Sequence, residues 1–339
     1  MEKKLIFLHN SRCTGNSLDT YIVEAFGYGD KVIKSGEAGK DFHDYPYILE
    51  NINNPNVRFV LGHNVFGLHR HVQDDFEYFT NVRDPVKRLI SGYSAWVGEQ
   101  GKTITDWLNH QSFELNNGIV KRLCGYGKLN NRVYDFTRDR YVEDILVPDE
   151  SFLEKAIRNI EKYHGTILFT EMFIESLLLF EERYGLLPLF SLTKNYYNQS
   201  KLKLAEDEVD PAVVEYIREN NHLDYQLYDY LKGNFIREIA SRPKEFHERV
   251  RIRKILSSML KVPGKDILSG RNFEEAFYRG VNKLLFFGMI DELVEILKLI
   301  IAKNNVTRPL SENIIHSVSA AIPKESIEEL IHISESKEA

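Results

Sequence analysis

Residues 9–18, near the start of the chain, combine the residue types that bind phosphate groups. They read His-Asn-Ser-Arg-Cys-Thr-Gly-Asn-Ser-Leu and follow the apolar run 5–8. A turn between a strand and a helix directs successive backbone N–H groups and the positive end of the helix dipole at one place. Arg12 adds a charge-assisted fork, and Ser17 adds a hydroxyl at the helix start. The segment predicts an anion-binding turn; the alternative is an ordinary turn in which Ser17 or Asn16 only caps the helix.

A second segment with basic and hydroxyl side chains lies at residues 83–93. It reads Arg-Asp-Pro-Val-Lys-Arg-Leu-Ile-Ser-Gly-Tyr and follows the apolar run 78–82. Proline is favoured at the first position of a helix, so Pro85 is expected to open one. Arg83 at the strand end and Ser91 in the helix are then expected to converge on a second phosphate. The alternative is a local ion pair between Arg83 and its neighbouring aspartate, with a solvated serine.

His63 is the candidate proton acceptor. It follows Gly62 after the apolar run 57–61, so we expect it at the same sheet edge as the two segments above. An imidazole titrates near neutral pH and serves well as a general base. The alternative is a histidine at a strand end that bonds a backbone carbonyl. His69 and His71 form no zinc-binding spacing with the other histidines, and no metal site is expected.

A basic stretch between residues 121 and 140 lies in a region rich in asparagine and glycine. Such composition is typical of loops, and loops often carry binding residues. We therefore expect an acceptor loop here, suited to an anionic or polyhydroxyl molecule. Its basic residues are Lys121, Arg122, Arg132, Arg138 and Arg140.

The hydrophobic pattern predicts the elements that position these residues. Helical patterns, among them 151–163 and 174–184, separate short apolar runs that are typical of buried strands. Such alternation predicts an α/β fold with a central, mostly parallel sheet, helices on both faces and ligands at the carboxyl ends of the strands. The apolar runs are residues 5–8, 57–61, 78–82 and 166–169.

The pattern changes beyond residue 235, where helical segments are interrupted by prolines and glycines. We expect one domain over residues 1–235 and an all-helical C-terminal domain over residues 236–339. The apolar stripes of its helices are expected to pack into a core, in pairs that resemble a helical repeat; the alternative is an oligomerisation surface that makes a homodimer. The expected helices are residues 273–287, 289–302, 311–320 and 324–334.

Composition and charge exclude several classes of protein. A chain of 339 residues with 43% hydrophobic residues can bury a large core. Its 44 basic and 50 acidic residues give a net charge of −6, so no nucleic-acid partner is expected. Two cysteines, Cys13 and Cys124, fit a reducing compartment, and a cytoplasmic location is expected. No signal peptide is expected, because the N-terminal apolar run 5–8 is too short for one. No transmembrane segment is expected, because no stretch of 18 apolar residues occurs.

The two phosphate-binding segments resemble, in the same order, motifs of sulfotransferases that use 3′-phosphoadenosine 5′-phosphosulfate (PAPS). Residues 9–18 are similar to the 5′-phosphosulfate loop His-Ile-Pro-Lys-Thr-Gly-Gly-Thr-Ser-Leu of the carbohydrate-modifying group. Residues 83–93 are similar to the element Arg-Asp-Pro-x-x-Arg-x-x-Ser-x-Tyr, which holds the 3′-phosphate in that family. Further similarities extend the resemblance over residues 1–235, and Gly62-His63 most resembles an element of uronyl 2-O-sulfotransferases.

This resemblance implies a P-loop-like three-layer fold and a role for each matched residue. Arg83 and Ser91 are expected to hold the 3′-phosphate of PAPS, and His63 is expected to be the catalytic base. Arg12 is expected to bind the phosphosulfate and to stabilise charge on the leaving phosphate. The other residues of the phosphosulfate loop are Cys13, Thr14, Gly15, Asn16 and Ser17. A polar stretch that resembles the segment closing over the donor contains Lys194, Asn195, Lys201 and Lys203.

The implied activity is transfer of a sulfuryl group from PAPS to an acceptor hydroxyl, on a saccharide, a lipid or a small natural product, with release of adenosine 3′,5′-bisphosphate. Arg12 stands where the family usually has lysine, and Ser11 and Thr14 replace a proline and a glycine. Arginine keeps the charge but does not readily donate its proton. One alternative is therefore a catalytically silent PAPS-binding protein whose helical domain recruits a partner. Another is a P-loop kinase, but the Walker lysine and magnesium carboxylates are missing from their expected places.

Overall fold

The computed structural model divides the chain into two compact units, Met1–Ser176 with Asn198–Ser241 and Leu177–Tyr197 with Arg242–Ala339. Both phosphate-binding segments and His63 belong to the first unit. The expected domain boundary at residue 235 remains a prediction. The structure describes residues 3–26, 32–34, 45–96, 103–129, 132–142, 146–185, 204–259, 285, 288, 290–301 and 308–336.

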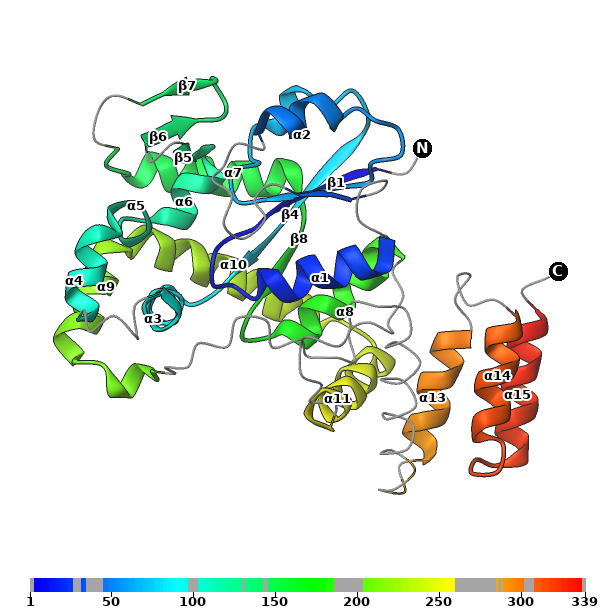
Figure 1. The fold of residues 1–339 in the computed structure, drawn as a ribbon. Helices are drawn as coiled ribbons and strands as arrows, with labels where there is room; N and C mark the ends of the chain where they lie inside the picture. Colours follow the sequence, from blue (N-terminus) through cyan, green and yellow to red (C-terminus); the bar gives the residue numbers. More distant parts are fainter. Residues whose placement is uncertain are drawn as a thin grey trace. The chain divides into compact units, whose positions relative to one another are not determined.

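The first unit contains a five-stranded parallel sheet, which confirms the predicted α/β class (Figure 1). Its order is β2-β3-β1-β4-β8, and each neighbouring pair is parallel. Strands β1 and β3 are buried along their whole length, as a sheet covered on both faces requires. The sequence did not predict β2, because three residues are too few to show a period. The strands are β1 (Lys4–Leu8), β2 (Val32–Lys34), β3 (Phe59–Gly62), β4 (Phe76–Val82) and β8 (His164–Phe169).

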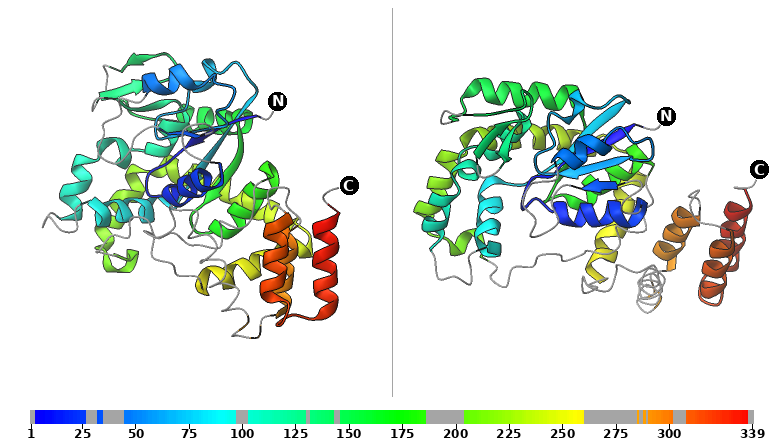
Figure 2. Two further views of the ribbon diagram at one scale, coloured as in Figure 1. Left: turned by 45° about the vertical axis from the view of Figure 1, so that its right-hand side comes forward. Right: turned by 45° about the horizontal axis from the view of Figure 1, so that its top comes forward.

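Helices lie on both sides of this sheet, with α1 (Gly15–Phe26) on one side and α7 (Glu150–Tyr163) on the other (Figures 1 and 2). Asp149 caps α7 by accepting a hydrogen bond of 3.0 Å from the Ser151 N–H. Helix α8 (Phe173–Tyr184) follows β8 and continues into the second unit. The other helices of the first unit are α2 (Tyr45–Asn51), α3 (Pro85–Trp96), α4 (Ile104–His110), α5 (Ser112–Leu115), α6 (Gly118–Leu123), α9 (Pro211–Asn220) and α10 (His222–Ala240).

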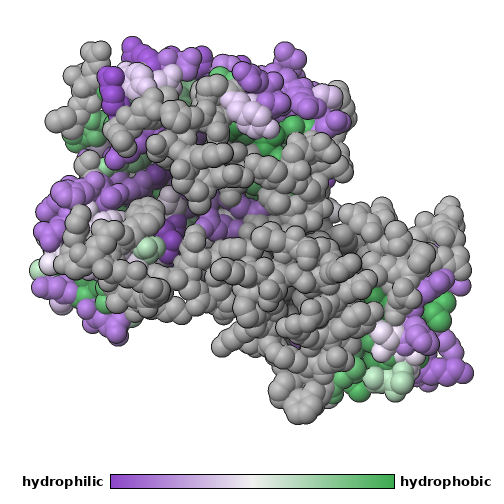
Figure 3. Space-filling view, viewed as in Figure 1, coloured by the Kyte–Doolittle hydropathy of each residue, from purple (hydrophilic) through white to green (hydrophobic). Residues whose placement is uncertain are grey.

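A small antiparallel sheet occupies the region where the sequence predicted an acceptor loop. Its strands are β5 (Tyr126–Leu129), β6 (Arg132–Asp135) and β7 (Arg140–Tyr141). Lys121 and Arg122 are buried in α6 instead of lying in a loop, whereas the arginines of β6 and β7 are exposed. The sequence did not predict β6, because its four residues, Arg-Val-Tyr-Asp, show no alternation of polar and apolar side chains. Hydrophilic residues predominate among the described residues in this part of Figure 3.

The described elements of the second unit beyond residue 241 are helices. They are α11 (Lys244–Met259), α13 (Ile290–Ile301), α14 (Arg308–Val318) and α15 (Lys324–Glu335). The last three lie within a few residues of the positions that the hydrophobic pattern predicted, and Lys298 of α13 pairs with Glu329 of α15 at 2.9 Å. The helix predicted at 273–287 lies almost wholly outside the described residues. Among the described helices, none has the length and apolar character needed to cross a bilayer.

His164 makes the folded state sensitive to acid. Its Nδ1 lies 3.3 Å from the Asn159 carbonyl oxygen, and its Nε2 is buried without a hydrogen-bond partner. Burial lowers the His164 pKa from 6.5 to about 4. Below pH 6.5 the unfolded chain therefore binds a proton that the folded chain does not, so the free energy of unfolding falls between about pH 6.5 and 4, by at most ~1.4 kcal/mol per pH unit.

We expect His164→Phe to lose less unfolding free energy than the wild type when the pH is lowered from 7 to 5. The aromatic ring keeps the contact with Phe66, whose ring stacks on His164 at 5.9 Å. Urea unfolding at the two pH values measures the difference. Equal losses in the two proteins would show that His164 does not cause the acid sensitivity.

Candidate functional site

The two phosphate-binding segments and His63 meet at the carboxyl ends of three neighbouring strands. Strand β1 is central, and its last residue, Leu8, pairs with Gly62 of β3 and with Thr80 of β4. Residues 9–14 follow β1, His63 follows β3, and Arg83 follows β4. Parallel strands end at the same edge of a sheet, so this strand order brings the three predicted parts of the site together.

Buried amide side chains hold the loop after β1 in place. The Asn10 N–H donates to Asn81 Oδ1 at 2.8 Å, and Asn81 Nδ2 donates to the Cys13 carbonyl at 2.7 Å. Asn10 Nδ2 donates to Thr80 Oγ1 at 3.1 Å, and Thr80 Oγ1 donates to the Leu8 carbonyl at 2.7 Å. Asn10 Oδ1 is buried without a hydrogen-bond partner, but the other side-chain groups named above are bonded, and such a buried polar network is rigid. The loop conformation is thus fixed without a ligand.

The backbone of this loop forms a concave set of N–H donors. Arg12 and Thr14 adopt left-handed conformations, with φ of 65° and 66°. In the described part of the chain, the backbone N–H groups of residues 12–15 have no acceptor. Such alternating conformations turn successive N–H groups toward one point and bind anions. The proline and glycine that the resembling family has at positions 11 and 14 are therefore not needed for a turn here.

His9 and Gly15 pack against each other where the loop joins α1. A Cβ on Gly15 would lie 2.0 Å from His9 Nε2, so no larger residue fits beside the ring. The His9 ring stacks on Phe7 with centroids 5.2 Å apart, and its Nδ1 lies 3.4 Å from Asp19 Oδ2. His9 therefore orients the loop through its ring contacts, and Gly15 allows α1 to start close to the His9 ring.

Arg12, Arg83 and Ser91 meet across the loop, as the sequence predicted. The Arg12 guanidinium donates to Ser91 Oγ at 3.2 and 3.3 Å, and Arg83 donates to the Arg12 carbonyl at 3.2 Å. Among the described residues no carboxylate pairs with either arginine. Burial, and then the charge of Arg83, lower the pKa of Arg12. Two neighbouring guanidinium groups without a counter-charge favour binding of an anion.

The remaining residues of the first segment contribute in different ways. Cys13 is buried, burial raises the pKa of its thiol to about 12, and the thiol donates to the Ser11 carbonyl at 3.5 Å. Its backbone N–H is therefore the group that Cys13 can offer to an anion. Helix α1 begins at Gly15, and the Thr14 carbonyl accepts from the Ser17 N–H at 3.2 Å. Asn16 and Ser17 therefore lie in the first turn of the helix and are not its N-cap. This placement argues against the ordinary capped turn that was the alternative interpretation.

His63 is held as a neutral imidazole beside the loop. Its Nδ1 lies 2.6 Å from the His9 carbonyl oxygen, so Nδ1 carries the proton and Nε2 has the free lone pair. Burial, and then the charges of His9 and Arg122, lower the His63 pKa to about 3. A pKa of about 3 departs from the near-neutral value that the sequence predicted for this imidazole. The carbonyl bond is the one expected for a structural histidine, and it leaves Nε2 as the nitrogen that can accept a proton.

No protein-family model and no curated protein matches this sequence.

Two side chains that sequence reasoning did not assign to the site support the second segment. Glu171, after β8, accepts the Asp84 N–H at 3.1 Å. The hydroxyl of Tyr225 in α10 lies 3.4 Å from both the Val86 N–H and Asp84 Oδ1. The Asp84 carboxylate also accepts the Lys87 N–H at 3.0 Å, whereas Arg83 donates to the Arg12 carbonyl of the loop. These bonds of Asp84 and the bond of Arg83 to the Arg12 carbonyl argue against the alternative interpretation, a local ion pair between Arg83 and Asp84.

Lys201 and the other residues of the expected closing segment, at positions 194, 195 and 203, lie outside the described residues. Their predicted contact with a donor phosphate stays a prediction. The structure brings together the other predicted site residues, Arg12, Cys13, Thr14, Gly15, Asn16, Ser17, His63, Arg83 and Ser91, around the ends of β1, β3 and β4.

Proposed function

We propose that this protein is a PAPS-dependent sulfotransferase with a P-loop-like three-layer core. The observation that carries the proposal is the meeting of Arg12, Arg83 and Ser91 at a loop of unpartnered N–H groups. An isolated N–H loop would suit any phosphate, but a second cationic site beside it suits a ligand with two separate anionic groups. PAPS carries a 3′-phosphate and a 5′-phosphosulfate.

The residues present fit such a donor. The N–H groups of residues 12–15 and the Arg12 guanidinium would hold the phosphosulfate, and Arg83 with Ser91 would hold the 3′-phosphate. The two unpaired arginines would gain the counter-charge that the described chain does not supply. PAPS supplies an activated sulfuryl group whose leaving group is a phosphate.

The proposed transfer needs a base on one side of the sulfur and positive charge on the other. An acceptor hydroxyl oxygen forms a bond to sulfur while the bond between sulfur and the bridging phosphate oxygen breaks, and its electron pair stays with adenosine 3′,5′-bisphosphate. The acceptor proton moves to His63 Nε2. Arg12 and the loop N–H groups stabilise the charge on the leaving phosphate, as preorganised donors do in phosphoryl transfer. Arg12 acts by charge and not by donating a proton.

A catalytically silent donor-binding protein is the second candidate. It is favoured by Arg12, which replaces the usual lysine and already bonds Ser91. Both candidates bind the donor, and only the first transfers the sulfuryl group.

We expect His63→Ala to abolish turnover and to leave the affinity for adenosine 3′,5′-bisphosphate unchanged, because His63 contributes no charge to the donor site. Loss of a general base costs about 10²- to 10⁴-fold in rate. Bisphosphate release from PAPS is measured with a panel of neutral and uronate-containing oligosaccharides as acceptors. Arg83→Ala is the control, and it should weaken bisphosphate binding itself. Equal turnover of the wild type and His63→Ala would remove the assigned base, and no turnover by the wild type would favour the silent protein.

A further inference from the structure

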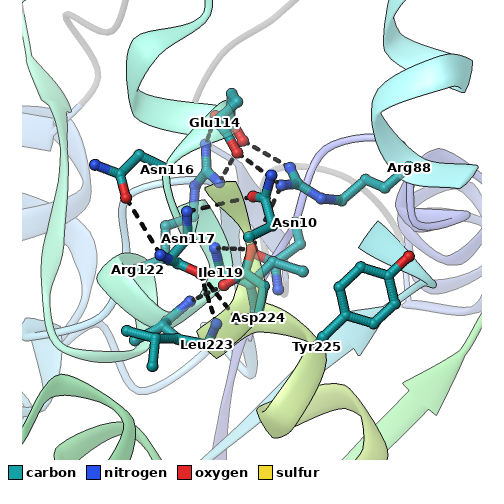
Figure 4. Close-up of polar contacts among 12 residues, drawn as sticks. Asn10, Arg88, Glu114, Asn116, Asn117, Ile119, Arg122, Leu223, Asp224 and Tyr225 are labelled. Atoms are coloured by element: carbon teal, nitrogen blue, oxygen red, sulfur yellow. Dashed lines mark hydrogen bonds and ion pairs between the residues drawn. The ribbon is translucent and has the colours of Figure 1, made fainter. Parts of the chain in front are cut away.

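A buried cluster of ion pairs lies next to the donor site and has no role in the proposed reaction. Glu114 of α5 bonds Arg88 of α3 and Arg122 of α6, so one carboxylate joins three helices (Figure 4). Arg88 Nη1 donates to Glu114 Oε2 at 2.7 Å, and Arg122 Nη1 donates to the same oxygen at 3.0 Å. Arg122 Nη2 also pairs with Glu114 Oε1. Both arginine side chains are less than 10% exposed.

The cluster keeps its charges in the folded protein. Burial alone would raise the Glu114 pKa, but the two arginines outweigh burial and hold this pKa well below its ordinary value. Burial disfavours the charge of Arg88, but Glu114 and Asp224 outweigh it and raise the Arg88 pKa. Removing one partner of such a buried pair is costly, because the other charge is left uncompensated.

The N-termini of α6 and α10 cap each other next to this cluster. Asp224 of α10 accepts the N–H groups of Ile119 and Val120 at the start of α6, at 3.1 and 2.8 Å. Asn117, just before α6, accepts the N–H groups of Leu223 and Asp224 at the start of α10, at 2.9 and 3.1 Å. Each helix therefore caps the other, as Figure 4 shows. Besides this capping, Asp224 Oδ2 lies 3.6 Å from Arg88 Nη2, whereas Glu114 contacts both Arg88 and Arg122.

Arg88 connects the cluster to the donor site, because it lies on the same helix as Ser91, α3. Arg88 precedes Ser91 by three residues, so both lie on nearly the same side of this helix. Ser91 receives the Arg12 guanidinium at 3.2 and 3.3 Å. A Cβ on Gly92 would lie 2.8 Å from the Trp107 ring, which shows how closely α3 packs there. A rotation of α3 by a fraction of a turn would separate Ser91 from Arg12.

Arg122, which lies on α6, connects the cluster to the segment that contains His63. Helix α6 leads into β5, and Asn64, the neighbour of His63, donates to the Lys128 carbonyl of β5 at 2.9 Å. A Cβ on Gly127 would lie 2.2 Å from Asn64 Oδ1, so this contact is tight. Glu114 thus contacts α3, which carries Ser91, and α6, which leads to the β5 contact beside His63.

We propose that Glu114 is a positioning residue, which fixes α3 and α6 through Arg88 and Arg122 and thereby aligns Ser91 with the donor loop and the β5 contact with His63. This inference rests on the proposed function for its ligand, adenosine 3′,5′-bisphosphate. Its structural part, the fixing of α3, does not depend on any ligand. Glutamine at position 114 keeps the size of the side chain and removes the charge that holds both arginines.

The test compares Glu114→Gln with Glu181→Gln in the full chain. Glu181 pairs with Arg253 at 2.5 Å in the second unit, and both side chains are less than 10% exposed, so the control removes a buried carboxylate of the same kind. We expect both variants to lower the melting temperature. Bisphosphate affinity by calorimetry should fall about tenfold or more in Glu114→Gln, because misplaced binding groups lose affinity steeply, and should stay within about twofold in Glu181→Gln.

Amide hydrogen exchange of residues 85–96 supplies a second readout that needs no ligand. Faster exchange of these amides in Glu114→Gln, but not in Glu181→Gln, is the expected result. Unchanged exchange of α3 in Glu114→Gln would overturn the positioning role, and so would equal losses of affinity in the two variants. Absence of bisphosphate binding by the wild type would instead contradict the proposed function, and the exchange of α3 would then decide the role of Glu114.

The charge-conserving double variant Glu114→Gln/Arg122→Gln should bind as weakly as Glu114→Gln. Recovered affinity would show that charge balance, and not positioning, is the role of Glu114.

Discussion

Arg12→Gln is expected to bind adenosine 3′,5′-bisphosphate about 10- to 150-fold more weakly than the wild type while folding with equal or greater stability. One hydrogen bond to a charged group contributes roughly 1.5–3 kcal/mol, which corresponds to this range of affinities. The stability does not fall, because burial and the charge of Arg83 already disfavour the Arg12 cation in the ligand-free protein. Glutamine also retains a donor for Ser91 Oγ.

Weaker binding combined with equal or greater stability is typical when a binding group is unfavourably placed in the ligand-free protein. Calorimetric titration measures the affinity, and urea unfolding without ligand measures the stability. Arg132→Gln is the matched control, since Arg132 is exposed and lies over the Tyr141 ring at 4.4 Å. It should change neither quantity substantially. A loss of stability in Arg12→Gln with unchanged bisphosphate affinity would identify Arg12 as a structural residue.

Gly15→Ala is expected to disrupt the loop and to lower both the stability and the bisphosphate affinity. The new Cβ would lie 2.0 Å from His9 Nε2. The His9 ring cannot turn away freely, because it is stacked on Phe7 and its centroid lies 4.4 Å from that of His63. Overpacking of this kind costs roughly 1–3 kcal/mol, which exceeds the ~1 kcal/mol that alanine gains over glycine in a helix.

Gly233→Ala in α10 supplies the matched control for this substitution. The nearest atom to its Cβ is Arg237 Nη1 at 3.7 Å, so alanine fits there and is expected to stabilise the helix by up to ~1 kcal/mol. Thermal unfolding with and without bisphosphate measures both effects. A Gly15→Ala protein that retains wild-type stability and affinity would show that the contact between His9 and Gly15 does not shape the loop.

The elements that carry the site could be predicted from the sequence because their signals are local. The apolar runs before His9, His63 and Arg83 correspond to β1, β3 and β4, and the helix expected after the first turn corresponds to α1. Both phosphate-binding segments are continuous in sequence, so their residue types were visible before the strand order was known. The β1–β3 and β1–β4 pairings then brought them together.

The residues that hold the site could not be predicted, because their partners are distant in sequence. Asn81 contacts the loop 71 residues before it, and Asp224 caps a helix that starts more than 100 residues earlier. The one local signal was the polar pair Thr80-Asn81 in the buried part of β4, since a buried polar residue must find a partner. Glu114 gave no signal at all, because a glutamate in a short helix is ordinary in any sequence.

The most direct test of the proposed function is a calorimetric titration of the wild-type protein with adenosine 3′,5′-bisphosphate, AMP and ATP under the same conditions. AMP lacks the 3′-phosphate that Arg83 and Ser91 are expected to hold, and ATP places its extra phosphates on the 5′ side. The predicted result is binding of the bisphosphate at least about tenfold tighter than that of either other nucleotide, as one lost charge-assisted contact requires. Preference for ATP, or no binding of the bisphosphate, would contradict the assignment of the site at the ends of β1 and β4.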